Sequence, residues 1–343
     1  MDYHGRHKIL DPSRISRYPL LQRRNKVRLE QLATPETARR QHIELPVLTE
    51  KSIDTIAIAI RTARSAGRAV ILFTGAHLVK NGLGPLVADL VRRGLVTLVA
   101  GNGATAIHDF ELALIGQTSE DVPNALGAGQ FGMSREFDYL NAALQLGDSL
   151  ALGFGESLGR MIRDADFRGH VLAKLNPPAD APRNFAHPQV SILAACHDCA
   201  VPMTIHVGIG TDVTDQHPSF DGRAKGGCSG RDFLIFADEV ARLAGGGVVL
   251  NVGSAVTGPE VLLKAVSMAA NVGTPPTGLI TADLDLRPQG PARCGEDTHP
   301  YYFRDQKSVV TRIPEAFGGR GYYVQGDQKL TFVRLFQKLT ESQ

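Results

Sequence analysis

From residue 49 onward, the apolar positions of the chain alternate between two spacings. Over residues 49–66 they recur every three to four residues, so that Ile53, Ile56 and Ile60 share one helical face. Residues 69–73 form a continuous apolar run instead, which is typical of a strand buried on both faces of a parallel sheet. The pattern therefore predicts a helix followed by a buried strand.

The same alternation continues to the end of the chain. It predicts strands over residues 69–73, 95–100, 201–206, 248–252, 278–282 and 322–324, and helices over residues 49–66, 83–93, 104–115, 134–162, 190–199, 232–243, 259–270 and 330–339. Residues 117–133 are polar and glycine-rich, and residues 164–189 contain several prolines, so we expect a long loop and a surface excursion there. Because short glycine turns join the strands to the helices, we predict an α/β fold: a doubly wound, mainly parallel sheet with helices on both faces, of Rossmann type.

The first 45 residues differ from the rest. Residues 1–40 carry ten lysines and arginines against four acidic residues, and few strongly apolar clusters. We expect residues 1–45 to form a basic arm that packs on a neighbouring subunit or stays loose, and residues 46–343 to form a single α/β domain. Only the charge favours an arm that binds nucleic acid or another acidic partner, and no interleaved aromatic residues support base stacking.

Composition narrows the class of protein. The 343 residues are 43% hydrophobic and carry a net charge of only +2, which excludes wholesale disorder and gives no general affinity for polyanions. No uncharged apolar run approaches the roughly 18–20 residues of a membrane helix, and the first ten residues resemble no secretory signal. Four cysteines in so long a chain do not form a disulfide framework. We therefore expect a soluble, cytoplasmic protein without a membrane partner.

Candidate binding loops follow the predicted strands, because ligands of open parallel sheets bind beyond the carboxyl ends of the strands. Glycine and polar residues gather at these ends in residues 74–77, 101–103, 206–212, 253–258 and 281–283. Such loops either present backbone N–H groups to a pyrophosphate or simply permit tight turns. Residues 101–106, GNGATA, match the GxGxxA dinucleotide fingerprint after a strand and before a helix. The acidic residue expected about 20 positions later would be Glu120 or Asp121, which lie in the polar segment.

Ionisable residues follow this fingerprint directly. His108 and Glu111 are three residues apart on the predicted helix and share neighbouring faces, with Asp109 between them. An imidazole and a carboxylate at the mouth of a nucleotide pocket suit general acid–base chemistry or the binding of an amine. The alternative is that these ionisable residues only form a solvent-exposed helix face.

Two other groups of residues suggest alternative functions. Cys196, Cys199, His217 and Cys228 are candidate zinc ligands, together with nearby acidic residues, and would support a zinc-assisted hydrolase or deaminase; buried thiols at a helix end are the alternative. The segment GESLG around Ser157 matches the GxSxG elbow of serine hydrolases, but it continues a helical pattern.

The segments ILFTGAHLVKNG and LVTLVAGNGATAIHDFELALIGQTSEDV resemble the NAD-binding core of the deoxyhypusine synthase-like superfamily. The second is more similar still to the archaeal-type NAD-dependent ornithine cyclodeaminase domain, which shows a GN-x-x-A-x-HD-x-E-x-AL-x-G-T-S run. The matching residues are Gly101, Asn102, Ala106, His108, Asp109, Glu111, Ala113, Leu114, Gly116, Thr118 and Ser119, with Gln117 as one inserted residue. The resemblance is strong over residues 70–122 and looser over the rest of residues 50–290.

The resemblance implies an enzyme that uses NAD to oxidise a C–N bond of an amino acid or small amine through an imine. It places NAD against Thr74, Gly75, His77, Asn102, Gly103, Ser254 and Asp283, with Asp109 close by. His108 and Asp109 would act as acid–base and amine-orienting residues, and Asp212 or His206 would complete the substrate side, with Asp215 as a further candidate. It also implies a homotetramer with shared sites.

Two departures limit what carries over. His108 replaces an acidic amine-binding residue of deoxyhypusine synthase, and residues 250–257 contain no lysine for a covalent imine, so we do not expect deoxyhypusine synthesis. Lys225 could substitute, although a solvated loop lysine is the simpler interpretation. The missing lysine also leaves open a nucleotide-binding sensor or assembly protein without catalysis.

Overall fold

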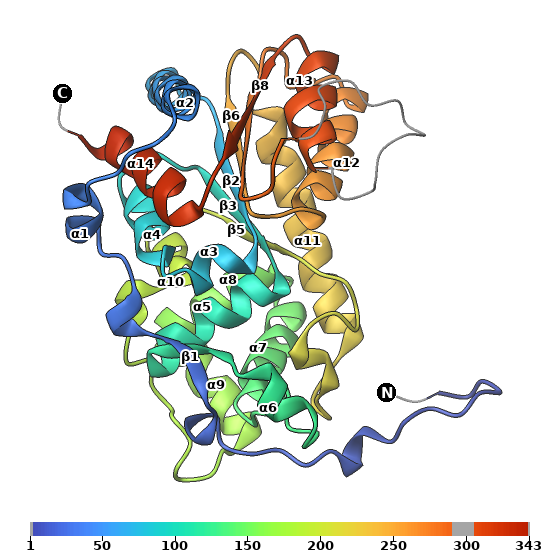
Figure 1. Cartoon of the computed structure of the whole chain (residues 1–343). Helices are drawn as coiled ribbons and strands as arrows, with labels where there is room; N and C mark the ends of the chain where they lie inside the picture. Colours follow the sequence, from blue (N-terminus) through green and yellow to red (C-terminus); the bar gives the residue numbers. More distant parts are fainter. Residues whose placement is uncertain (1–2, 290–304, 342–343) are drawn as a thin grey trace.

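The core of the molecule is a six-stranded parallel sheet, shown at the centre of Figure 1, in a computed structural model that describes residues 3–289 and 305–341. Its strands are β2 (Val70–Thr74), β3 (Leu98–Asn102), β5 (Met203–His206), β6 (Val248–Val252), β7 (Ile280–Asp285) and β8 (Arg320–Gln325), in the spatial order β5-β3-β2-β6-β7-β8. Every neighbouring pair is parallel. Numbered along the chain, this order is 3-2-1-4-5-6, the order of dinucleotide-binding Rossmann folds.

Helices cover both faces of the sheet because its strands are apolar on both sides. In β2, Val70 and Leu72 belong to one buried cluster, while Ile71 and Phe73 belong to the other. The first cluster includes α2 (Val47–Ser65), α4 (Gly84–Arg92), α5 (Gly103–Ile115) and α14 (Gln328–Thr340), and the second includes α11 (Gly222–Ala241) and α12 (Thr257–Asn271). The predicted doubly wound fold is thus confirmed.

A group of helices extends the first layer below the sheet in the view of Figure 1. It consists of α7 (Phe137–Ser149), α8 (Phe154–Arg163), α9 (Ala165–Leu175) and α10 (Ile192–Asp198). The sequence predicted no helix at α9, and it predicted that α11 begins at residue 232 rather than at Gly222. Helix α11 begins earlier because Asp221 accepts hydrogen bonds from the first-turn N–H groups of Arg223 and Ala224. At Gly227 the Asp148 carboxylate lies against the helix, so a Cβ there would require the Asp148 side chain to move.

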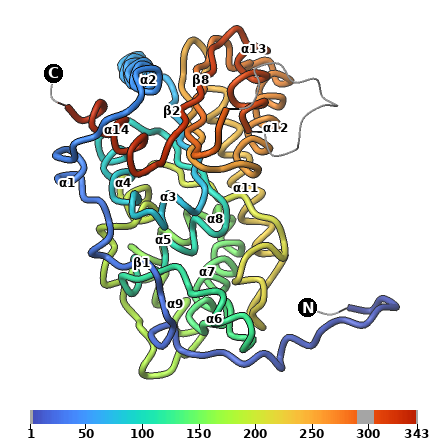
Figure 2. The backbone as a smooth tube through the Cα atoms, viewed as in Figure 1, coloured from blue at the N-terminus to red at the C-terminus, as the bar shows by residue number. Residues whose placement is uncertain are grey.

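The N-terminal segment divides into two parts. Residues 18–45 pack on the chain's own domain: β1 (Asn25–Arg28) pairs antiparallel with β4 (Gln117–Glu120), and α1 (Pro35–Arg40) lies against α14. Leu20 is buried. Residues 3–17 extend away from the body, as the tube in Figure 2 shows, and nearly all of them are exposed. Residues 18–45 are therefore neither loose nor extended in this structure, and the domain boundary at residue 45 stays a prediction. The loop expected at residues 117–133 contains β4 and α6 (Val122–Leu126).

Shorter helices complete the description. They are α3 (Ala76–Lys80), α6 (Val122–Leu126), α13 (Ile313–Ala316) and a π-helix at Gln306–Arg312. Within the two described ranges, no helix combines the length and the apolar character needed to cross a membrane.

Candidate active site

The strand order reverses between β2 and β6, and this switch point is where open α/β sheets bind their ligands. Gly75 follows β2 and Gly253 follows β6; the Gly75 N–H donates to the Val252 carbonyl oxygen at 3.1 Å. A Cβ at Gly75 would overlap the Gly253 carbonyl oxygen, and Gly253 has a φ of +66°, a backbone conformation that favours glycine. Two loops thus meet here without a side chain between them.

The fold assigns the two predicted glycine segments to different positions. Residues 74–77 follow the first strand of the sheet, where Rossmann folds carry the pyrophosphate-binding turn, whereas GNGATA follows the second strand. Asn102, at the end of that second strand, therefore takes the position from which an acidic residue usually binds the ribose. Its Oδ1 accepts a hydrogen bond from the Thr105 N–H at 2.9 Å, which caps α5. The fingerprint predicted from spacing alone was therefore placed one strand too late.

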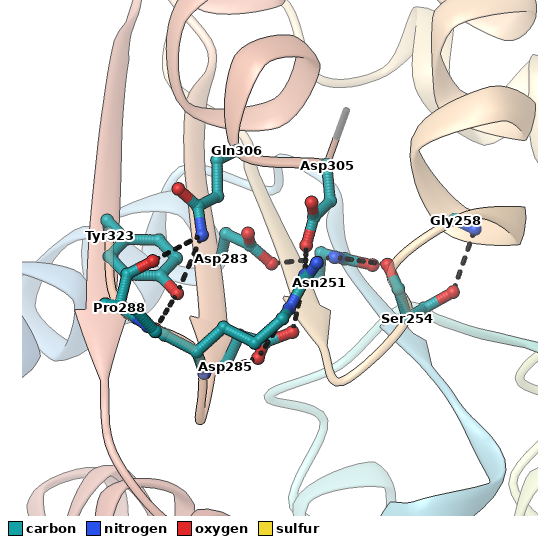
Figure 3. Close-up of polar contacts among 10 residues, drawn as sticks. Asn251, Ser254, Gly258, Asp283, Asp285, Pro288, Asp305, Gln306 and Tyr323 are labelled. Atoms are coloured by element: carbon teal, nitrogen blue, oxygen red, sulfur yellow. Dashed lines mark hydrogen bonds and ion pairs between the residues drawn. The ribbon is translucent and has the colours of Figure 1, made fainter. Parts of the chain in front are cut away.

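Hydrogen bonds that involve Ser254 and Asp283 hold the loop after β6, as Figure 3 shows. Asn251 Nδ2 donates to Asp283 Oδ1 at 2.8 Å and to the Ser254 carbonyl oxygen at 2.9 Å. Ser254 Oγ accepts from the Gly258 N–H at 2.9 Å, near the start of α12. Burial, and then the charge of Asp305, raise the pKa of Asp283 well above its usual value. Asp283 is fully buried and accepts a hydrogen bond from Asn251, and its contact with a cofactor stays a prediction.

Two buried amide oxygens near this loop have no hydrogen-bond partner among the described residues. They belong to Asn251 and Gln328. Gln328 begins α14, and its side-chain Nε2 lies so close to Gly253 that a Cβ on the glycine would overlap it. Unpaired buried acceptors are costly and uncommon, so they fit a ligand that brings donors to the switch point. No sequence motif pointed to Gln328.

A cavity of about 260 Å³ opens beside α5. Its lining comprises Arg23, Lys80, Ala104, Ile107, His108, Glu111, Ser119, Glu120, Val122, Phe131, Phe137, Thr211, Asp212 and Val213. The structure thus brings together two of the predicted catalytic residues, His108 and Asp212. It adds Lys80, from the helix after the first glycine loop, and Arg23, from the segment expected to be an arm.

His108 is oriented by a buried relay. Its Nδ1 lies 2.7 Å from Thr118 Oγ1, and the Thr118 hydroxyl donates to Glu111. Glu111 forms a buried ion pair with Arg23 Nη2 at 2.5 Å. Burial acts to raise the pKa of Glu111, but the charge of Arg23 and the contacts with His108 outweigh it and hold the pKa below its usual value.

The relay defines the tautomer of the imidazole. Glu111 is ionised and can only accept, so Thr118 must donate its single hydroxyl proton to Glu111. Thr118 can then only accept from His108, which places the ring proton on Nδ1. Nε2 of the neutral ring therefore carries the lone pair that can take up a proton.

Asp109 and His206, by contrast, are structural. Asp109 accepts hydrogen bonds from Ser191 Oγ at 2.5 Å and from the N–H groups of Ile192 and Leu193, at 2.8 and 3.0 Å, which caps α10. Burial raises the pKa of Asp109 to about 6. The His206 ring stacks on Phe73 at 5.6 Å between centroids, and burial lowers its pKa to about 4. Neither residue lines the cavity, so the structure does not bring them together with His108 and Asp212.

Asp212 is held by a lysine that was expected to be solvated. Lys225 is only 1% exposed, and its Nζ lies 2.7 Å from Asp212 Oδ2 and 2.5 Å from Asp215 Oδ1. Burial raises the pKa of Asp212, while the charge of Lys225 acts in the opposite direction. The three side chains together carry one net negative charge when all are ionised. Lys225 follows Asp212 by 13 positions and Asp215 by 10, and this spacing across a loop and a helix gave no sign of the contact.

The zinc and serine-hydrolase hypotheses both fail. Among residues 3–289 and 305–341, no group of three or more His, Cys, Asp or Glu side chains is arranged to hold a metal ion. Cys196 and Cys228 are buried, Cys199 is exposed, and His217 Nε2 lies 2.8 Å from the Gly132 carbonyl oxygen. Ser157 is buried within α8, where its hydroxyl donates to the Gly153 carbonyl oxygen at 2.6 Å, so it is no exposed nucleophile.

No protein-family model matches the chain, and no curated protein matches it in sequence. Solved structures with a related arrangement include ArgZ, an arginine dihydrolase from the ornithine-ammonia cycle in Cyanobacteria, at 17% identity and a TM-score of 0.49 over 87% of this chain and 33% of ArgZ. AgrE in its ternary complex with ornithine and NAD+ is 17% identical, with a TM-score of 0.48 over 88% of this chain and 34% of AgrE. A putative LOR/SDH protein from Methanococcus maripaludis S2 is 15% identical, with a TM-score of 0.43 over 87% of this chain and 71% of that one. The chain thus spans about a third of the length of ArgZ and AgrE.

Proposed function

We propose that this chain is an NAD-dependent enzyme that acts on a C–N bond of an amino acid or small amine. The observation that carries the proposal is the imidazole of His108, which lines a cavity at the edge of a Rossmann-like sheet with Nε2 free to accept a proton. A neutral imidazole whose other nitrogen is fixed by a hydrogen bond is well suited to general base catalysis. The sequence resemblance to the ornithine cyclodeaminase domain supports the same assignment.

The switch point fits a dinucleotide. Thr74, Gly75 and His77 would lie along the pyrophosphate, and Asn102 and Gly103 beside a ribose. Near the loop after β6, the unpaired amide oxygens of Asn251 and Gln328 would accept hydrogen bonds from the cofactor's hydroxyl or amide groups. NAD, when bound, supplies the acceptor for the hydride that leaves the carbon bearing nitrogen.

Residues of the cavity would bind the substrate and accept its proton. Asp212, with Asp215 and Lys225 behind it, provides a wall of net negative charge that attracts a substrate ammonium. His108 Nε2 would take a proton from the substrate nitrogen, and the ionised Glu111 would stabilise the resulting imidazolium through Thr118. Thr118 and Arg23 would act as positioning residues, because both act through Glu111 or His108.

The proposal is tested with His108→Gln, a variant that removes the imidazole. We expect wild-type protein and His108→Gln to bind NAD with the same affinity in calorimetric titrations. Turnover of amines or amino acids, followed as NADH formation or as loss of ammonia, should fall by about 10²- to 10⁴-fold in the variant. NAD binding without turnover in the wild type would favour the non-catalytic sensor, and equal turnover in both proteins would exclude His108 as the base.

The homotetramer implied by the sequence resemblance belongs to the same proposal. Light scattering of the purified protein measures it directly: a mass near four times 36.9 kDa is expected, and a monomer would contradict it.

A further inference from the structure

One cationic side chain in the cavity lacks a partner of opposite charge. Lys80 is half-buried at the end of α3 and forms no hydrogen bond or ion pair with any residue in the described parts of the chain. The neighbouring charges are already engaged: Arg23 with Glu111, and Asp212 with Lys225. Glu120 accepts from the Tyr18 hydroxyl at 2.7 Å and from the Gly132 N–H at 2.9 Å. Lys80 is therefore free to interact with a ligand.

A second donor in the same cavity is held in an unusual backbone conformation. Ser119 has a φ of +68°, in the left-handed region that a serine rarely adopts. Ser119 lines the cavity, and its hydroxyl forms no hydrogen bond with another described residue. Such backbone strain is concentrated at functional sites. These two features of Ser119 indicate a binding site independently of Lys80.

The positive charge of Lys80 affects the ionisation of His77, which lies on the same helix. The pKa of His77 is lowered first by burial, then by the positive charge of Lys80, and then by His108 when that ring is protonated. His77 and Lys80 lie three residues apart on α3, so they share neighbouring faces of the helix. His77 thus provides a reporter group for any anion that neutralises Lys80.

We propose that Lys80 and Ser119 form an oxyanion subsite in this cavity. The subsite deepens the proposed function: it binds a carboxylate of the substrate, so that the enzyme accepts amino acids and discriminates against the corresponding amines. Lys80 supplies charge and Ser119 a hydrogen bond, while the wall at Asp212 attracts the amino group. A phosphate of the cofactor has the same oxyanion chemistry and is the other source of such a ligand.

The binding experiment uses a matched pair of ligands. L-Ornithine and putrescine differ only by the carboxylate, and their affinities are compared in the presence of NAD for wild type, Lys80→Met and Ser119→Ala. Loss of a charge-assisted hydrogen bond corresponds to roughly 10- to 100-fold in affinity. We expect Lys80→Met to weaken ornithine binding by this factor without changing putrescine or NAD binding, and Ser119→Ala to weaken ornithine binding less. Lys51→Met, on the exposed side of α2, is the matched control and should change neither.

The same variants distinguish the two sources of the oxyanion. If Lys80→Met weakens NAD binding and leaves ornithine unaffected, the subsite exists but binds a cofactor phosphate. If Lys80→Met alters the affinity of no anionic ligand, the subsite is refuted.

A titration of the His77 ring by NMR makes the test independent of the proposed function. Lys80→Met should raise the pKa of His77, because a neighbouring positive charge is removed. Sodium acetate and inorganic phosphate should raise it in the wild type and not in Lys80→Met. A protein that binds no NAD but shows this anion response would refute the enzyme and retain the subsite. A protein whose His77 pKa does not respond to either anion, and whose ligand affinities do not respond to Lys80→Met, would refute the subsite.

Discussion

The carboxylate of Asp212 lies directly against Gly103, the first residue of α5, so that a Cβ at position 103 would overlap it. The glycine that the sequence assigned to a dinucleotide turn therefore serves to admit an acidic side chain from another loop. With Lys225 behind it, Asp212 is fixed between the start of one helix and the interior of another. The cavity wall is thus set by packing as well as by charge.

Lys225→Met should destabilise the protein strongly. The substitution leaves Asp212 and Asp215 as two buried carboxylates without a counter-charge, and breaking a buried ion pair in this way costs about 3–5 kcal/mol. Urea denaturation followed by circular dichroism measures the loss. The control is Lys264→Met, whose exposed ion pair with Glu260 should contribute less than about 1 kcal/mol. Equal, small effects of the two substitutions would show that Lys225 is not buried as described.

Arg23→Met tests whether the N-terminal segment belongs to the domain. Glu111 would lose its buried counter-charge, so we expect about 3–5 kcal/mol of destabilisation, and its pKa should rise. Deletion of the exposed residues 3–16 should leave the free energy of unfolding almost unchanged. A loose or exchanged arm would give the opposite order of effects.

Stability should decrease as the pH rises through neutrality because of Asp232. Burial raises its pKa to about 7, from 3.8, so its contribution to stability is complete below about pH 4 and is lost as the pH rises through 7. Asp109, with a pKa of about 6, acts in the same direction at lower pH. Burial lowers the pKa of His206 to about 4, so the stability that this residue contributes rises with pH between about 4 and 6.5 and does not change above pH 6.5.

Asp232 titrates within the window from pH 6.5 to 8, and Asp232→Asn is the matched variant that removes its contribution. The N–H groups of Gly155 and Ile205 both donate to Asp232 Oδ2, at 3.1 and 2.7 Å, and an amide oxygen can accept both. We expect the free energy of unfolding to fall more steeply across this window in the wild type than in Asp232→Asn. A parallel decrease in both proteins would assign the titration to another group.

Chelation should have no effect on the protein. The dispersed cysteines and His217 predict that EDTA leaves the melting temperature unchanged and that elemental analysis finds no stoichiometric zinc. A drop in melting temperature on chelation would restore the metal hypothesis.

Hydrophobic periodicity was sufficient to predict the layered core, because strands such as β2 and β6 are buried on both faces and read as continuous apolar runs. It failed where tertiary contacts override local preference. The glycine-rich start of α11 is helical because Asp221 caps it, and the polar β4 is a strand because β1 pairs with it.

The site could be predicted only in part from the sequence, for the same reason. His108 and Glu111 could be paired by helical spacing, but the link through Thr118 requires the turn that brings β4 back onto α5. Arg23 and Gln328 reach the site from distant segments, and no local pattern marks them. Lys225 was considered only as a replacement for the missing lysine, and its contact with Asp212 was not predicted. Asp109 and His206 have the residue types of catalytic groups, and only their burial and contacts show that they are structural.

The most direct test of the account is a calorimetric titration of the purified chain with NAD, accompanied by a thermal-shift measurement. We predict one NAD bound per chain and a clear rise in melting temperature, because a ligand that binds only the folded state stabilises it by about 2.7 kcal/mol at 100 times its dissociation constant. The absence of both binding heat and thermal shift with NAD and with NADP would contradict the assignment of the switch point as a dinucleotide site.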